Sequence, residues 1–99
     1  MTYLETYNLR YQSQTLKPRM VVACVKAAQD ILNEDTGTAD HAKRVLWARS
    51  ALTAPDGMAE RMLWGVLGNS TIQGSGDSAS DSDIQFTVNS LIHIYMEEV

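Results

Sequence analysis

The sequence predicts an all-α fold, namely a small bundle of about five helices with a flexible Ser/Gly/Asp loop before the C-terminal helix. Apolar residues recur at spacings of three and four along most of the chain, as on one face of a helix. Residues that cap or stop helices stand between these periodic segments. No long alternating pattern indicates strands, and no repeat of about 20 to 50 residues is present. We therefore expect residues 1–99 to form a single helical domain.

Two helices are expected in the first third of the chain. Thr2 and Glu5 have the spacing of a capping box and predict a short first helix. Ser13 to Thr15 is expected to end this pattern. Pro18 then fits the first turn of a second helix, which runs to about Asn33. Apolar residues cover more than half of its circumference and predict the central helix: Met20, Val21, Cys24, Val25, Ala27, Ala28, Ile31 and Leu32.

A turn and a third helix follow. "NEDTGT" has the composition of a turn, in which Gly37 can adopt a positive φ and Thr38 can cap the next helix. This helix should run from Ala39 to about Thr53, because Pro55 forces the preceding residue out of helical geometry. Its predicted inward stripe is Ala42, Val45, Leu46 and Leu52, with Trp47 and Ala51 beside it.

The fourth helix should begin at once, since Thr53 and Asp56 repeat the capping spacing around Pro55. One face of this helix is apolar, and Trp64 lies off that face. The residues of the face are Met58, Met62, Leu63, Val66 and Leu67.

Residues 69–81 are rich in Ser, Gly and Asp and predict a linker before the last helix, at about 82–98. Ser82 and Gln85 form its expected capping pair, and Asp81 and Asp83 lie near the positive end of its dipole. One stripe of this helix is apolar, whereas Phe86 and Ile94 point elsewhere. The stripe is Ile84, Val88, Leu91, Ile92 and Tyr95.

Composition disfavours several classes of function. The net charge is −4 and the basic residues are scattered among acidic ones, so specific nucleic-acid binding is not expected. No apolar run approaches the ~18 residues of a membrane span, so we expect a soluble protein made in the cytoplasm, with no membrane partner. Cys24 is interpreted as a small buried apolar side chain in a reducing compartment.

No catalytic, cofactor or metal site is expected. His41 and His93 belong to different predicted helices, and neither has a second ligand type at a zinc spacing. His93 and Glu97 are interpreted as a solvated pair four residues apart. Asp40 and His41 are adjacent and therefore diverge on a helix, so they cannot act as a base and its orienting partner. The prediction is a non-enzymatic protein without a cofactor or a small-molecule substrate.

The C-terminal helix is the expected site of interaction, because it carries apolar residues on more than one face. We predict an interface with another subunit, formed by Asp81, Asp83, Phe86, Leu91, Ile94 and Tyr95. The alternative is that the domain wraps both faces of its last helix.

Four segments, "MTYLETYNLRYQ", "VVACVKAAQDILNED", "ADHAKRVLWARSAL" and "DSDIQFTVNSLI", together resemble small virion-region proteins of tailed bacteriophages. The resemblance covers most of the chain. It implies a helical protein of the virion that acts by assembly, as a connector or adaptor at the head–tail neck, or else on the capsid or in tail assembly. The implied partners are other copies of the chain and other virion proteins. The resemblance supplies no catalytic residue.

Two other classes stay open. One is a small acidic phage-encoded inhibitor of a host defence complex, similar to an anti-CRISPR protein, whose carboxylates would occupy a nucleic-acid groove. Only Asp77, Asp81 and Asp83 form an acidic cluster of the kind that this function needs. The other is an enzyme of unfamiliar type.

Overall fold

The computed structural model describes residues 3–34, 37–69 and 79–97. In these ranges the chain forms four α-helices and no strand. They are α1 (Tyr3–Asn33), α2 (Ala39–Thr53), α3 (Pro55–Asn69) and α4 (Asp81–Glu97). The all-α prediction is confirmed. Most of the predicted linker, residues 70–78, lies outside the described residues.

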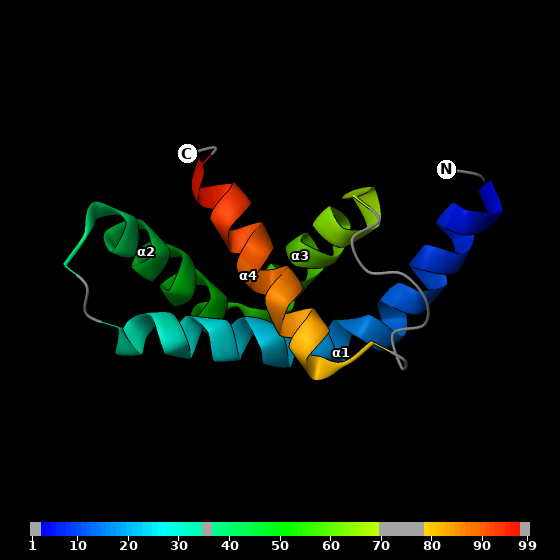
Figure 1. The fold of residues 1–99 in the computed structure, drawn as a ribbon. Coiled ribbons are helices and arrows are strands. Elements are labelled where there is room, and N and C mark those ends of the chain that lie inside the picture. Colours follow the sequence, from blue (N-terminus) through cyan, green and yellow to red (C-terminus); the bar gives the residue numbers. More distant parts are fainter. Residues whose placement is uncertain (1–2, 35–36, 70–78, 98–99) are drawn as a thin grey trace.

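The expected count of five helices is wrong, because the first two predicted helices are one continuous helix, α1. It passes through Ser13 to Thr15 without a break and holds Pro18 in its interior. Proline removes one helical hydrogen bond and favours a bend, and Figure 1 shows the blue N-terminal part of α1 inclined to its cyan part. Leu16 and Met20, on either side of Pro18, are both buried in the core. Their packing favours continuing the helix across the proline.

Helix α1 is central, as predicted, because it packs against each of the other three helices. In Figure 1 it forms the base of the molecule, and α2, α3 and α4 rise from it. None of the helices in the described part of the chain has the length and apolar character needed to cross a membrane.

The core is built largely from small side chains. Of the seventeen buried apolar residues in the part of the chain whose burial is described, six are alanines, and they come from α1, α2 and α3. Small side chains at a contact let helix axes approach closely. The six alanines are Ala23, Ala27, Ala28, Ala48, Ala51 and Ala59. Larger volume comes mainly from methionines, Trp47 and the aliphatic residues of α4.

The predicted inward stripe of α2 is wrong at Ala42, Leu46 and Leu52, whereas Val45 packs against the core as predicted. The buried residues of this helix are Trp47, Ala48 and Ala51, whereas Leu46 is among the most exposed apolar residues described. Hydrophobicity alone favours turning leucine inward. Ala48 and Ala51 instead pack against the face of α1 that includes its alanines. This orientation of α2 turns its two leucines outward.

The turn before α2 agrees with the prediction. Gly37 has a φ of 64°. Thr38 is the N-cap of α2, since its side-chain oxygen accepts a hydrogen bond from the His41 backbone N–H at 3.1 Å. The His41 Nε2 lies 2.9 Å from the Ile31 carbonyl oxygen. A carbonyl oxygen can only accept, so Nε2 carries the proton and ties the start of α2 to the end of α1.

The predicted capping of α3 by Thr53 is wrong. The Thr53 hydroxyl donates back to the Arg49 carbonyl oxygen at 2.8 Å, within α2. The carbonyl oxygen of Ala54 accepts the first bond of α3, from Met58 N–H at 3.0 Å. Asp56 lies in the first turn, where a carboxylate is favoured by the helix dipole. The two helices therefore meet at one residue, without room for a separate cap.

The predicted apolar face of α3 is buried at Met58, Met62 and Leu63. Trp64 is largely exposed, in agreement with its place off that face. Val66 and Leu67 belong to the same predicted face, but their side chains are not among those that the structure describes.

Two glycines should respond to alanine in opposite directions. Gly37→Ala should lower the free energy of unfolding by about 1–2 kcal/mol, because an alanine is strained at a positive φ. Gly57→Ala should raise it by about 0.4–1 kcal/mol, because this residue is helical and a new Cβ would meet only the Ala54 Cβ, at 4.0 Å. Urea unfolding of both variants measures the difference. Changes of the same sign would contradict the described conformations.

The thiol of Cys24 should make stability depend on alkaline pH. Burial raises the pKa of Cys24 from 9.0 to about 11, so the folded state favours the neutral thiol. This contribution is fully present below about pH 9 and is lost as the pH rises toward about 11, by at most about 1.4 kcal/mol per pH unit. Urea unfolding at several alkaline pH values, compared with Cys24→Ala, isolates the effect of this thiol. Parallel pH profiles for the two proteins would contradict it.

Candidate functional site

The predicted interface residues belong to α4, whose first turn is capped two residues earlier than expected. Ser80, and not Ser82, is the cap, because its Oγ accepts a hydrogen bond from Asp83 N–H at 3.0 Å. Its carbonyl oxygen also accepts the first helical bond, from Ile84 N–H at 3.1 Å. Asp81 and Asp83 lie in the first turn, as predicted. Helix α4 therefore begins at Asp81.

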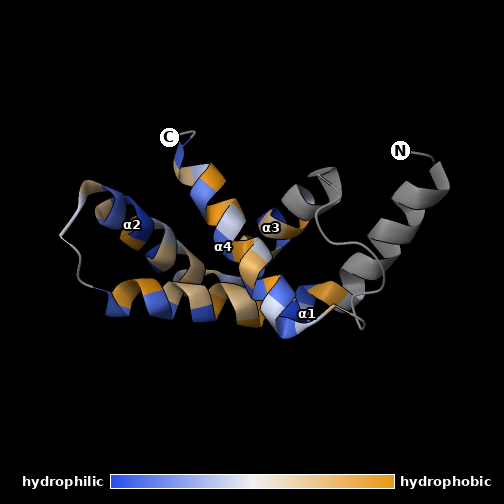
Figure 2. Ribbon diagram, viewed as in Figure 1, coloured by the Kyte–Doolittle hydropathy of each residue, from blue (hydrophilic) through white to orange (hydrophobic). Residues whose placement is uncertain are grey.

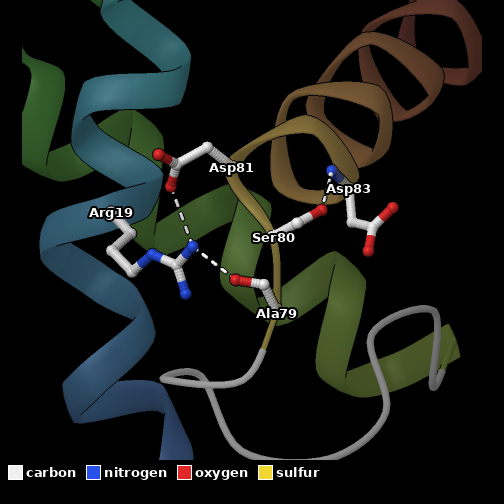
Figure 3. Close-up of polar contacts among 5 residues, drawn as sticks. All are labelled: Arg19, Ala79, Ser80, Asp81 and Asp83. Atoms are coloured by element: carbon white, nitrogen blue, oxygen red, sulfur yellow. Dashed lines mark hydrogen bonds and ion pairs between the residues drawn. The ribbon is translucent and has the colours of Figure 1, made fainter.

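An arginine of α1 holds the start of α4 (Figure 3). The Arg19 Nη2 donates to the carbonyl oxygen of Ala79 and to the Asp81 Oδ1, the latter at 2.8 Å. The Arg19 side chain is only 26% exposed, whereas that of Asp81 is 98% exposed. Asp81 was predicted to contact another subunit. The structure instead joins it to Arg19 within one chain, and this contact anchors α4 at its first turn.

The inward face of α4 completes this anchoring. Ile84, Val88 and Ile92 are buried in the core, and Leu91 is half-buried against it. The predicted apolar stripe therefore faces inward over most of its length. Tyr95 departs from it, because it lies near the end of α4 and stays half-exposed. Of the predicted interface residues, Leu91 thus contributes mainly to the chain's own core.

The outward face of α4 carries large apolar side chains. Phe86 is 73% exposed and Ile94 is 50% exposed. Tyr95 is 49% exposed, but it lies about 180° from Phe86 around the helix, on the side that faces α2 and α3. Phe86 and Ile94 are eight positions apart, so they lie about 80° apart around the helix and share one side. Figure 2 shows apolar residues on the visible side of α4. Full burial of one such side chain is worth about 1.5–3 kcal/mol, which this chain by itself leaves unrealised.

A groove of about 740 Å³ runs between α1 and α4. Val22 and Phe86, both strongly exposed, line it together with the charged side chains of Arg19, Lys26 and Asp81. No local sequence pattern predicts this groove, because its walls come from helices about 60 residues apart in the chain.

A second hollow, of about 230 Å³, lies between α2, α3 and α4. Two cationic side chains, Lys43 and Arg61, stand at a wall that is otherwise largely apolar. The remaining lining residues are Leu46, Trp47, Ser50, Met58, Tyr95 and Met96. We call these eight residues the basic hollow. Lys43 and Arg61 were predicted only as scattered surface charges, and no local sequence signal brings them together.

The histidines have structural or surface positions. His41 is engaged with the Ile31 carbonyl oxygen, as described above. His93 Nε2 lies 3.3 Å from Glu97 Oε1, and both side chains are well exposed. This pair has the solvated geometry predicted for it. Across residues 3–34, 37–69 and 79–97, no three His, Cys, Asp or Glu side chains gather as a metal site would require.

Loss of the Arg19 contacts should loosen α4. Arg19→Ala should lower the free energy of unfolding by about 1–3 kcal/mol, because it removes hydrogen bonds made by a partly buried cation. It should also speed hydrogen exchange at α4 amides. Lys26→Ala, an exposed position on the same helix, is the control and should change stability by less than about 0.5 kcal/mol. Equal effects of the two substitutions would argue against an anchoring role.

Comparison of this chain with protein-family models, with curated proteins and with solved structures finds no match. The feature of the described structure that bears on function is the exposed apolar face of α4.

Proposed function

We propose that this chain is a non-enzymatic structural protein of a tailed bacteriophage virion, and that it acts through contacts between subunits at the head–tail neck. The outward face of α4 carries the proposal of assembly, because Phe86 and Ile94 expose large apolar surfaces on this helix. The resemblance to small virion-region proteins supports the place in the virion. A capsid-associated position or a role in tail assembly would use the same surface.

The way α4 is held favours a surface made for binding. Its inward face is packed in the core, and Arg19 fixes its first turn. The outward side chains therefore have a defined position before any partner arrives. Such preorganisation lowers the entropic cost of association. The proposed partners are other copies of this chain and other virion proteins.

The inhibitor hypothesis gains no support from the described carboxylates. Asp81 is bound by Arg19 within the chain, which leaves Asp83 as the carboxylate at the start of α4 that has no ion pair among the described residues. Asp77 lies outside the described residues. An inhibitor that imitates a nucleic acid needs several carboxylates available together.

Light scattering coupled to size-exclusion chromatography tests the assembly proposal. The full chain should form a defined oligomer, and the double variant Phe86→Ser, Ile94→Ser should shift it toward monomer while keeping its helical circular dichroism. Leu32→Ser, at the exposed end of α1, is the matched control and should leave the oligomer intact. Substitution is a cleaner test than truncation before α4, because Ile84, Val88 and Ile92 belong to the core. A monomeric full chain at high concentration would refute assembly by self-contact.

Mass spectrometry of purified phage particles tests the place in the virion. The chain should remain with the particles through density-gradient purification, in a fixed ratio to the major structural proteins. Loss of the chain from intact particles during purification would refute a structural place in the virion.

A further inference from the structure

We propose that the basic hollow receives the N-terminal end of α4 from a second copy of this chain, with Asp83 and Phe86 as the inserted side chains. The proposal rests on the assembly function proposed above and specifies which two surfaces of the subunit meet.

The chemistry of the basic hollow calls for an acidic and apolar partner. Lys43 and Arg61 come from α2 and α3, and no carboxylate belongs to the described residues that line the hollow. The ion pairs found among the described residues join Lys17 to Glu60, Arg19 to Asp81 and His93 to Glu97, so they use neither cation. Beside these charges lie the aromatic rings of Trp47 and Tyr95. A partner that offers one carboxylate next to one aromatic ring would match both features.

The size of the basic hollow favours a side chain over a metabolite. Its volume is about 230 Å³. Pockets for small molecules generally measure about 300–1,000 Å³. The space is therefore suited to a protruding residue of another protein.

The start of α4 carries a group of the required kind. Asp83 and Phe86 are three residues apart and so are neighbours on the helix surface. Phe86 is the most exposed of the large apolar side chains described, and Asp83 is exposed and has no ion pair among the described residues. Figure 3 shows the Asp83 carboxylate directed away from Arg19, which holds Asp81 instead. We call Asp83 and Phe86 the acidic knob.

The two surfaces must meet between copies and not within one chain. Tyr95 and Met96, which line the basic hollow, lie at the opposite end of α4 from the acidic knob. Phe86 and Tyr95 are nine residues apart, which is about 13 Å along a helix. The rigid α4 therefore keeps a chain's own knob out of its own hollow.

Charge complementarity favours a second copy as the occupant. The chain has a net charge of −4, so two copies repel each other unless a local positive surface faces an acidic one. The basic hollow and the acidic knob provide this pairing. Because the two surfaces differ, the contact is head-to-tail, and its repetition closes into a ring where the rotation allows.

Mixing two defective variants tests the head-to-tail contact. The hollow variant is Lys43→Glu, Arg61→Glu, and the knob variant is Asp83→Asn, Phe86→Ser. Each should lose the oligomer when alone. An equimolar mixture should form a heterodimer and nothing larger, because only one intact hollow and one intact knob remain in each pair. Light scattering measures the masses, and circular dichroism verifies that both variants fold.

A charge-matched control separates the contact from general repulsion. Gln29→Glu, Ala39→Glu, Arg49→Glu changes the net charge as much as the hollow variant does, at exposed positions that line neither the basic hollow nor the groove beside Phe86. It should keep the oligomer. If the hollow variant also keeps it, or if the mixture stays monomeric, the knob-in-hollow contact is overturned while assembly through another surface stands. A monomeric full chain would overturn the contact together with the proposed function.

Discussion

The fold depends on one constraint: a single face of α1 has to serve as the packing surface for three other helices. Among the described residues that face consists of three alanines with Leu16, Met20, Cys24 and Ile31, so the helices can approach closely but bury little volume at the alanines. A thin core of this kind leaves no second layer to cover the outer faces of α2 and α4. The leucines of α2 and the Phe86 and Ile94 side chains of α4 are exposed because no further helix of the described chain covers them. Exposed apolar surface is therefore a consequence of the architecture and is available for contacts with partners.

Helix α4 combines two requirements that pull in different directions. Its inward residues must remain in the core for the chain to stay folded, and its outward residues carry the proposed interface. Arg19 helps to meet both requirements, because it holds the first turn of α4 through the Ala79 carbonyl oxygen and the Asp81 carboxylate, which lie outside the core. The contact also changes the role expected for Asp81. Of two neighbouring carboxylates, one becomes part of the chain's own structure and the other remains available.

The distribution of charge matters more than its sum. A net charge of −4 describes an acidic protein, yet Lys43 and Arg61 lie together at a hollow whose described lining includes two aromatic rings and no carboxylate. The subunit therefore has two different charged surfaces, one positive at the basic hollow and one negative at the acidic knob. A subunit of this kind associates in a defined order with copies of itself, and the association should weaken as salt screens the charges.

Local features of this chain could be read from the sequence alone. The all-α class, the positive φ of Gly37, the capping of α2 by Thr38 and the inward stripe of α4 each depend on residues within a few positions of one another. Only the tertiary structure decided the features that depend on distant residues. Packing around Pro18 joined two predicted helices, alanines and not leucines turned α2 toward α1, and Arg19 met Asp81 across 62 positions. The physical reason is that periodicity and capping act within one or two helical turns, whereas the rotation of a helix and the meeting of side chains depend on the shape of the surface it packs against.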